Sequence, residues 1–266
     1  MLKGEKIFIS PFYFFKRIDD MNLWIILKKE LRSYFSSWIA YVLFSVFLAM
    51  SGYFFYTDLV YFTMWQGSDI QIGMWQFFFH DIRFIMLLMI PVLTMGLFAE
   101  EKKSGTVELL FTFPLKDIDI LMGKFLSSIF IFFLMLFFTI IYPVVLNYIH
   151  AIDFAPVAAG YLGLFLMGCA FISVGILVSS ITENQIIAAF VTFVCLLFFW
   201  TVGWNEGVGG EIVTKLTMAI SFFDHFYGFA RGVIEIKDVV FNISFTLLFL
   251  FFTIKSLESR KWKGVK

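Results

Sequence analysis

The sequence predicts an all-α integral membrane protein with six membrane-spanning helices. Its 266 residues are 61% hydrophobic and 15% charged, whereas ordinary soluble domains have about 25% charged residues. The apolar residues form runs of about 20, the length needed to cross the hydrocarbon core of a bilayer. The run from 130 to 141 is apolar except for Thr139, so it lacks the alternation of a β-barrel strand. This composition excludes a disordered chain, a secreted disulfide scaffold and a conventional soluble enzyme.

The predicted spans follow the apolar runs along the chain. We place them at about 38–57, 77–99, 125–148, 157–181, 186–203 and 239–257. The fourth span is rich in small residues, which predicts close packing against another helix. These residues are Ala159, Gly160, Gly163, Gly168, Ala170, Ser173, Gly175 and Ser179. The two cysteines have no spacing that suits a metal site, and we expect buried thiols.

The basic residues predict the orientation of the spans. Sixteen of the 20 lysines and arginines precede the first span, lie between the second and third spans, or lie at or beyond the end of the sixth. The connections 58–76 and 149–156 contain none. Because positive charge accumulates on the cytoplasmic side, both termini are expected in the cytoplasm, with 260–266 as a basic tail.

The N-terminal region divides into two parts. Residues 1–20 are unlike a signal peptide and are predicted to be a loosely attached extension, or the product of an upstream start codon; a short interfacial helix is the alternative. From 23 to 38, apolar residues recur at helical spacing, which predicts an amphipathic helix on the cytoplasmic face or a polar preface to the first span. Its polar side contains Lys28, Lys29, Glu30 and Arg32.

The connection between the second and third spans predicts a further short helix. Gly105 can end the preceding helix, and Glu108 would lie in the first turn of the new one, where the helix dipole favours an acid. Pro114 would end it. We expect this helix to lie across the cytoplasmic face; its alternative role is interfacial packing alone.

Ionisable residues also gather toward the outer side. The segment 204–238 is too apolar for a free loop and too charged for a span, so we expect one or two short helices half-buried in the outer leaflet and packed against the spans. The ionisable residues near the start of the second span, His80, Asp81 and Arg83, are expected to be interfacial anchors, with a functional role as the alternative. The outer-face candidates are His80, Asp81, Arg83, His225, Arg231 and Asp238.

These segments resemble the permease subunits of ABC-2 type transporters. The stretch 29–41 resembles the family's entry into the first span, although Trp38 stands where proline is expected. The stretch 98–110, followed by Pro114, is similar to the loop after the second span and is the most specific signature. Stretches 179–189 and 225–238 resemble later parts of the family. The resemblance covers 21–259 and is nearest to the gliding-motility and nitrous-oxide-reductase-maturation permeases.

The resemblance implies half of an exporter in a bacterial inner membrane. Such permeases pair with a second permease, identical or related, and with two ABC ATPase subunits that bind ATP and magnesium. A cytoplasmic coupling helix transmits ATPase closure to the spans, and the interfacial helix would be a second contact. By position, the residues of the coupling region would be Glu100, Glu101, Gly105, Thr106, Glu108, Leu109 and Pro114.

The residues themselves indicate no ATPase or other enzyme in this chain. Its only Gly-Lys pair, Gly123–Lys124, lacks the other residues of a phosphate-binding loop, so ATP hydrolysis is expected in a partner. No nucleic acid, cofactor or metal partner is expected. The alternatives are an ATPase-linked anchor or assembly platform that contacts an envelope protein, and, less favoured, an intramembrane enzyme. The lack of mid-span charge suggests an amphiphilic or lipid-linked cargo.

Overall fold

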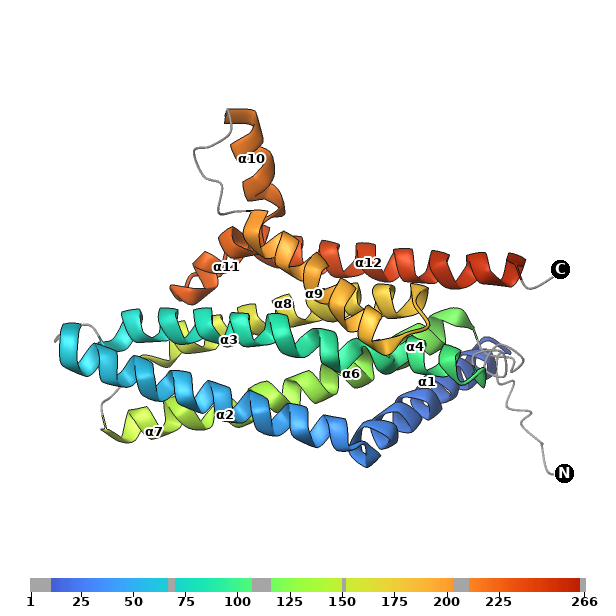
Figure 1. The fold of residues 1–266 in the computed structure, drawn as a ribbon, viewed down its shortest axis with the longest axis horizontal. Coiled ribbons are helices and arrows are strands. Elements are labelled where there is room, and N and C mark those ends of the chain that lie inside the picture. The colour runs from blue at the N-terminus through green and yellow to red at the C-terminus, as the bar shows by residue number, and fades with distance from the viewer. Residues whose placement is uncertain (1–10, 67–69, 107–115, 150–151, 203–210, 264–266) are drawn as a thin grey trace, which may run out of the picture.

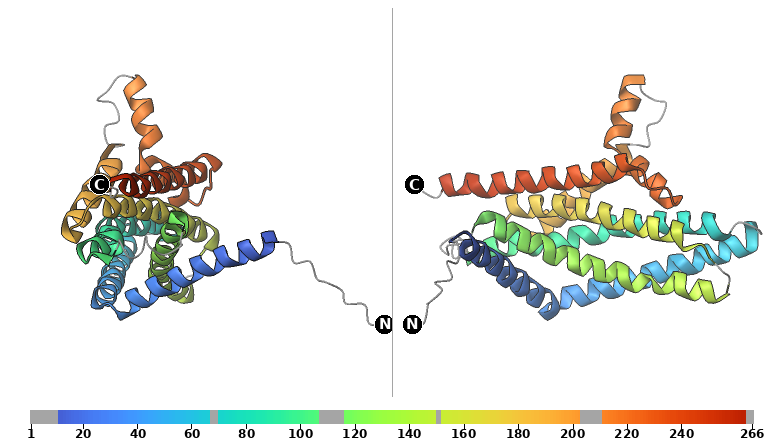
Figure 2. Two further views of the ribbon diagram at one scale, coloured as in Figure 1. Left: turned by 90° about the vertical axis from the view of Figure 1, so that its right-hand side faces the viewer. Right: turned by 180° about the vertical axis from the view of Figure 1, so that it is seen from behind.

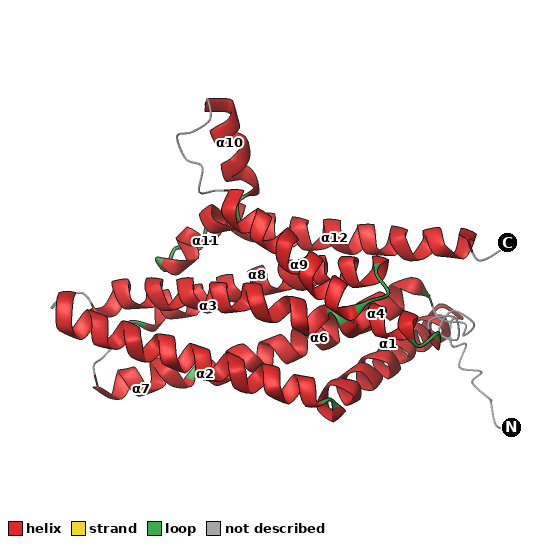
Figure 3. Ribbon diagram, in the orientation of Figure 1, coloured by secondary structure: helices red, strands yellow, loops and turns green. Residues whose placement is uncertain are grey.

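The computed structural model describes residues 11–66, 70–106, 116–149, 152–202 and 211–263. Every regular element in these ranges is helical (Figure 3). The helices form an elongated bundle with most axes running along its length (Figure 1). We call the end that contains Lys102, Lys103 and the C-terminal part of the last helix the basic end, and the other the opposite end.

Five stretches of the described chain are long and apolar enough to cross a membrane. They are Trp38–Met64, Gly73–Lys103, Asp117–Tyr148, Phe154–Ile181 and Ile236–Ser259. The helices that form them are α2 (Trp38–Tyr61) with the π-helix η1 (Phe62–Gln66), α3 (Ile70–Thr94) with α4 (Gly96–Lys103), α6 (Asp117–Thr139) with α7 (Ile141–Ile149), α8 (Phe154–Ile181), and α12 (Ile236–Lys263). These stretches correspond to five of the six predicted spans.

The remaining predicted span, 186–203, corresponds to the shorter helix α9 (Gln185–Thr201). Its 17 residues reach only about 26 Å at about 1.5 Å per residue, whereas the hydrocarbon core is about 30 Å thick. The sixth span therefore stays a prediction. α9 nevertheless runs from the basic end in the direction of the opposite end (Figure 1).

The helix α8 packs against α3, α6, α9 and α12. An added Cβ at Gly160 would overlap the ring of Phe79, and one at Gly168 would overlap the ring of Phe132. At Gly163 it would lie 2.6 Å from Cβ of Phe229. The prediction that small residues of this span permit close helix packing is therefore confirmed.

The span formed by α3 and α4 is interrupted at Met95, between the two helices. Ser179 of α8 bridges the interruption: its Oγ accepts hydrogen bonds from the backbone N–H groups of Phe98 (3.0 Å) and Ala99 (3.1 Å) and donates one to the carbonyl of Met95 (3.0 Å). A side chain thus replaces part of the missing helix bonding. This bridge fixes α4 against α8 at the basic end.

The predicted outer segment contains two helices, α10 (Glu211–Ile220) and α11 (Phe222–Ala230). α11 packs against α8, and its Phe226 and Phe229 are buried. α10 instead projects away from the bundle (Figures 1 and 2). The expectation that this segment packs against the spans therefore describes α11 and not α10.

The first helix, α1 (Pro11–Ser36), crosses the basic end of the bundle (Figure 2). It includes the predicted interfacial helix but begins earlier, so residues 11–20 are its first part. It ends one residue before Ser37, whose Oγ accepts a hydrogen bond from the N–H of Ile39 at 3.3 Å and caps α2. Residues 1–10 lie outside the described chain.

Candidate functional site

The helices α1 and α6 approach closely at the basic end. An added Cβ at Gly123 of α6 would lie 2.6 Å from Cγ2 of Ile26, and Ile26 is buried. Glycine therefore lets the backbone of α6 come close to α1. The next residue of α6 is Lys124, and the close contact at Gly123 brings it against α1.

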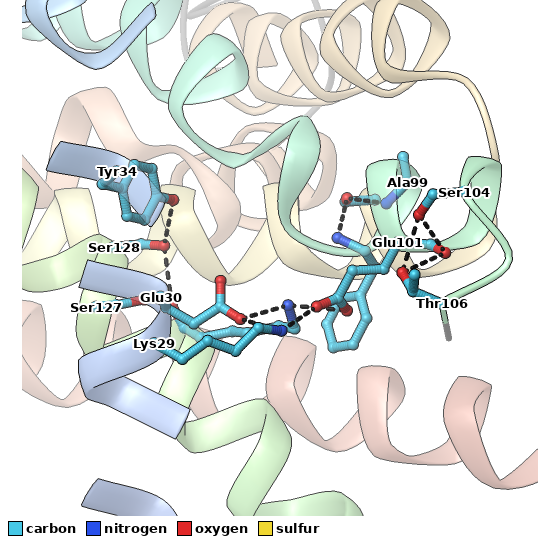
Figure 4. Close-up of polar contacts among 12 residues, drawn as sticks. Lys29, Glu30, Tyr34, Ala99, Glu101, Ser104, Thr106, Ser127 and Ser128 are labelled. Carbon is cyan, nitrogen blue, oxygen red and sulfur yellow. Dashed lines mark hydrogen bonds and ion pairs between the residues drawn. The ribbon is translucent and has the colours of Figure 1, made fainter. Parts of the chain in front are cut away.

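Lys124 is the centre of a cluster of four charged residues from three helices, which we call the Lys124 cluster. Its members Lys29, Glu30 and Glu101 are labelled in Figure 4. Its Nζ lies 3.0 Å from Oε1 of Glu30 on α1 and 3.0 Å from Oε2 of Glu101 on α4. Lys29 of α1 donates a hydrogen bond of 2.8 Å to Oε1 of Glu101 and lies 3.5 Å from Glu30. The cluster therefore joins α1, α4 and α6 and has no net charge.

Three members of the Lys124 cluster, Glu30, Glu101 and Lys124, are largely shielded from solvent, whereas Lys29 is exposed. Lys124 is 1% exposed, and its Nζ lies 5.1 Å from the centre of the Phe98 ring. Burial alone would lower the pKa of Lys29, but its hydrogen bond to Glu101 and the charges of Glu101 and Glu30 raise that pKa above its ordinary value. Because buried charges are costly without partners, these contacts restrict how the three helices can move independently.

A second set of polar contacts adjoins the cluster (Figure 4). The hydroxyl of Tyr34 on α1 donates a hydrogen bond to the carbonyl of Leu93 at 3.0 Å and lies 3.1 Å from Oγ of Ser128 on α6. Ser128 also bonds the carbonyl of Lys124 at 2.9 Å. Burial raises the pKa of Tyr34, which keeps its hydroxyl neutral. These bonds connect α1 to α3 and add a second connection between α1 and α6.

The chain that leaves α4 is held by its own polar groups. Oγ1 of Thr106 donates a hydrogen bond to the carbonyl of Glu101 at 3.2 Å and lies 2.9 Å from Oγ of Ser104. Between them, Gly105 has a φ of +71°, a left-handed conformation that favours glycine. Lys102 also donates hydrogen bonds to the carbonyls of Ser180 and Thr182. The chain that leaves α4 is therefore held partly by the backbone of Glu101, whose side chain lies in the Lys124 cluster.

The structure places the predicted residues of the basic end in different environments. Glu101 lies in the cluster, whereas Glu100 is exposed. Lys28 and Arg32 are exposed, as expected for the polar side of an interfacial helix. Glu30 is buried, so its predicted place on that polar side is wrong; its partner Lys124 makes burial possible. Glu108, Leu109 and Pro114 lie outside the described residues.

Lys124 is the functional candidate that sequence reasoning missed. The sequence analysis assigns Lys124 to the basic loop between the second and third predicted spans, because the third span is predicted to begin at 125. The structure begins α6 at Asp117 and buries Lys124 within it. The available signal was a lone cation between Gly123 and a run of apolar and hydroxyl residues, a pattern typical of a buried charge with a partner elsewhere.

The candidates at the opposite end form two groups. His80 Nδ1 lies 3.6 Å from Oδ1 of Asp81, while Arg83 points into aromatic side chains and is 4% exposed. Arg83 is thus not an interfacial anchor, because its guanidinium is buried. His225 Nδ1 lies 2.7 Å from Oδ1 of Asp238, which ties α11 to α12.

Arg231 is separate from both groups of the opposite end. Its guanidinium lies 4.9 Å from the centre of the Tyr227 ring, and the residue is exposed. Within the described ranges, no three histidine, cysteine or acidic residues lie close enough together to hold a metal ion.

The comparison with protein families decides what kind of membrane protein this is. Residues 24–221 match the family described as "ABC-2 family transporter protein", which is most of the chain and includes the Lys124 cluster and α3 to α10. The chain belongs to the ABC-2 transporter family. It is therefore a multi-pass membrane component, a permease, of an ABC-2 transporter. No curated protein matches the sequence.

Membership of the ABC-2 family explains the division of labour expected from the sequence. ABC-2 permeases lack an ATPase domain and work with an ABC ATPase. The absence of a phosphate-binding loop in the sequence agrees with this arrangement. The family resemblance inferred from residues 29–41 and 98–110 is thus confirmed at the level of the family.

Proposed function

We propose that this ABC-2 permease forms half of the translocation unit of an exporter and is driven by a separate ABC ATPase dimer. ATP and magnesium bind to the ATPase, and a second permease chain, identical or related, completes the unit. Export is the default that the family resemblance implies. The place nearest the gliding-motility and nitrous-oxide-reductase-maturation permeases rests on the stretches 29–41, 98–110, 179–189 and 225–238.

The observation that carries the proposal is the connection of Glu101 to both Lys29 and Lys124. Glu101 lies in the last turn of α4, immediately before the chain enters the predicted coupling helix at 105–112. A force applied to that helix would act on α4 and, through the Lys124 cluster, on α1 and α6. We infer that the cluster transmits ATPase closure to the spans.

The position of the charges supports the orientation. Lys102 and Lys103 end α4, Lys28 and Arg32 are exposed on α1, and Lys255 lies near the end of α12, all toward the basic end. By the positive-inside rule this end faces the cytoplasm. With α9 as the sixth span, both termini lie on that side of a bacterial inner membrane.

A second candidate is an ATPase-linked assembly platform without solute transport. The observation that favours it is α10, which projects from the bundle and exposes the large apolar side chain of Ile212. In that case α10 would contact an envelope accessory protein. The same Lys124 cluster would then transmit ATPase closure to α10 instead of to a translocation path for a cargo.

Purification of the tagged permease from its native membrane in mild detergent tests the proposal. We expect a cytosolic protein with a phosphate-binding loop to co-purify, and its ATPase activity to depend on the permease. Identification of a second permease-like chain would distinguish a heteromer from a homodimer. A permease that purifies alone, under conditions in which other ABC complexes remain intact, would contradict the proposal.

A further inference from the structure

Arg83 is a buried cation in the half of its span farther from the basic end. It lies on α3, within the candidate span Gly73–Lys103, and is 4% exposed. Its Nε and Nη1 atoms are buried and have no hydrogen-bond partner. A guanidinium has five N–H donors and no acceptor, so each nitrogen without a partner carries an unmet demand for an acceptor.

Three aromatic rings from distant parts of the chain surround this guanidinium. Its Cζ lies 4.4 Å from the centre of the Phe226 ring, 5.1 Å from that of Phe223 and 5.3 Å from that of Trp200. Phe226 and Trp200 are themselves buried. The ring faces attract the positive charge, but they do not replace the directed acceptors that a guanidinium binds in water. We call Arg83 and these three rings the Arg83 box.

The Arg83 box differs from the Lys124 cluster in its charge balance. Lys124 has two carboxylates at 3.0 Å, whereas the described part of the chain offers Arg83 no ion pair. The charge of Asp81 influences Arg83, but the carboxylate of Asp81 contacts His80 and not Arg83 in the described chain. An unpaired charge in a membrane span destabilises the fold, and such residues are functional candidates by default.

We propose that Arg83 binds the anionic head group, a phosphate or carboxylate, of an amphiphilic cargo. Guanidinium groups bind these oxyanions through charge-assisted hydrogen bonds, which would satisfy the free N–H groups. The surrounding rings provide an apolar surface for the part of the cargo next to its head group. The inference rests on the proposed function in calling the ligand a cargo; the binding site itself is argued from Arg83 and its box.

Thermal unfolding of the purified complex in phosphatidylcholine nanodiscs, without ATP, tests this inference. The three probes are lysophosphatidic acid, the monoacylglycerol with the same acyl chain, and inorganic phosphate. We expect lysophosphatidic acid alone to raise the unfolding temperature of the permease. In Arg83→Gln, the apparent affinity should fall by at least about tenfold, because charge-assisted hydrogen bonds are lost. Arg83→Lys, which keeps the charge but loses the planar fork, should bind with intermediate affinity.

The matched control is Arg231→Gln. Arg231 is an exposed arginine on the ring of Tyr227, so this change removes the same charge from the same end of the molecule and should leave the response to lysophosphatidic acid unchanged. Without a probe, Arg83→Gln should unfold at or above the temperature of the unaltered protein, because it removes an unpaired buried charge.

Three results would overturn the inference. A lower unfolding temperature of Arg83→Gln without a probe would make Arg83 a structural residue. Equal responses to lysophosphatidic acid and monoacylglycerol would show that the head group is not recognised, and an equal response to inorganic phosphate would exclude an amphiphile. These measurements need no ATP, so their failure leaves the co-purification of the ATPase, and hence the proposed function, unaffected.

Discussion

Glu101 at the end of α4 and Lys124 within α6 form an ion pair of 3.0 Å at the basic end of the bundle. The pair joins the end of one span to the beginning of the next, on either side of the connection that we propose contacts the ATPase. Since Lys124 is also 3.0 Å from Glu30, the same ammonium group holds α1 in place. The predictions below concern this pair and the packing that supports it.

Glu101→Gln should uncouple the permease from its ATPase. The change keeps the shape of the side chain but removes the charge that Lys29 and Lys124 share, and we expect the free energy of unfolding to fall by about 1.5–3 kcal/mol, the value of a hydrogen bond to a charged group. ATP-driven transport should fall more than ATP hydrolysis. Glu258→Gln, which removes an acid from the exposed ion pair with Lys255 on α12, is the control and should leave both rates unchanged. Equal effects of the two changes would contradict the role of Glu101.

Lys124→Met should destabilise the permease strongly. It removes the buried cation that Glu30 and Glu101 share and leaves them only the exposed Lys29, and breaking a buried pair of this kind costs about 3–5 kcal/mol. Thermal unfolding in detergent measures this effect, and Lys28→Met, on the exposed side of α1, is the control. The triple variant Lys124→Met, Glu30→Gln and Glu101→Gln should recover part of the stability; if it does not, the cost is one of packing and not of unpaired charge.

Gly105→Ala should weaken coupling with little effect on insertion. Gly105 has a φ of +71°, where a side chain costs about 1–2 kcal/mol per residue. Among the described residues, no atom lies within 4 Å of the added Cβ, so the strain that they account for comes from the backbone. Gly105→Asn is the control, because asparagine tolerates this conformation better. Transport measurements should therefore give a larger defect for alanine than for asparagine; the reverse order would exclude a backbone effect.

Glu108→Lys tests the predicted coupling helix directly. The residue lies outside the described chain, but by position it is in the first turn of that helix, where a lysine would oppose the helix dipole. We expect the protein to insert normally and to lose stimulation of its ATPase. Normal transport with intact stimulation would show that the assignment of this segment is wrong.

Gly168→Ala should disturb the packing of α8 on α6. The added methyl group would overlap the ring of Phe132, and overpacking of this kind costs about 1–3 kcal/mol. Gly52→Ala is the control, since its added Cβ would lie 3.3 Å from the nearest atom, the Tyr142 hydroxyl, compared with the overlap with the Phe132 ring at Gly168. Thermal unfolding should separate the two variants, and equal midpoints would argue against close packing at Gly168.

Much of the architecture could be predicted because hydrophobic runs and small residues act locally. The predicted span 157–181 begins three residues after the start of α8 and ends with it, whereas the predicted span 239–257 lies inside the longer α12. The starts of α3 and α6 were less accurate, because both helices begin among polar residues that single-residue hydropathy assigns to loops. The sequence predicts that the helix ends at Gly105, and the structure adds that Gly105 has a left-handed conformation, with a φ of +71°.

The buried charges could not be placed from the sequence. Helical periodicity assigned Glu30 to the polar side of α1, but its environment depends on the close contact of Ile26 with Gly123, far apart in the chain. Arg83 similarly meets Phe226 and Trp200 only after α9 and α11 fold onto α3. Burial of a charge is a property of tertiary packing, so a local pattern reports that a charge is present and not which partner it finds.

Photo-crosslinking from position 108 tests the central claim most directly. A photoreactive phenylalanine would replace Glu108 in the full-length permease in its native membrane, with a second variant at Tyr148, which is 89% exposed near the end of α7. We predict that position 108 captures a protein with a phosphate-binding loop, that the yield changes when ATP is trapped on it, and that position 148 does not capture it. Capture of that ATPase from position 148, or its absence from position 108 while it still co-purifies, would contradict the account.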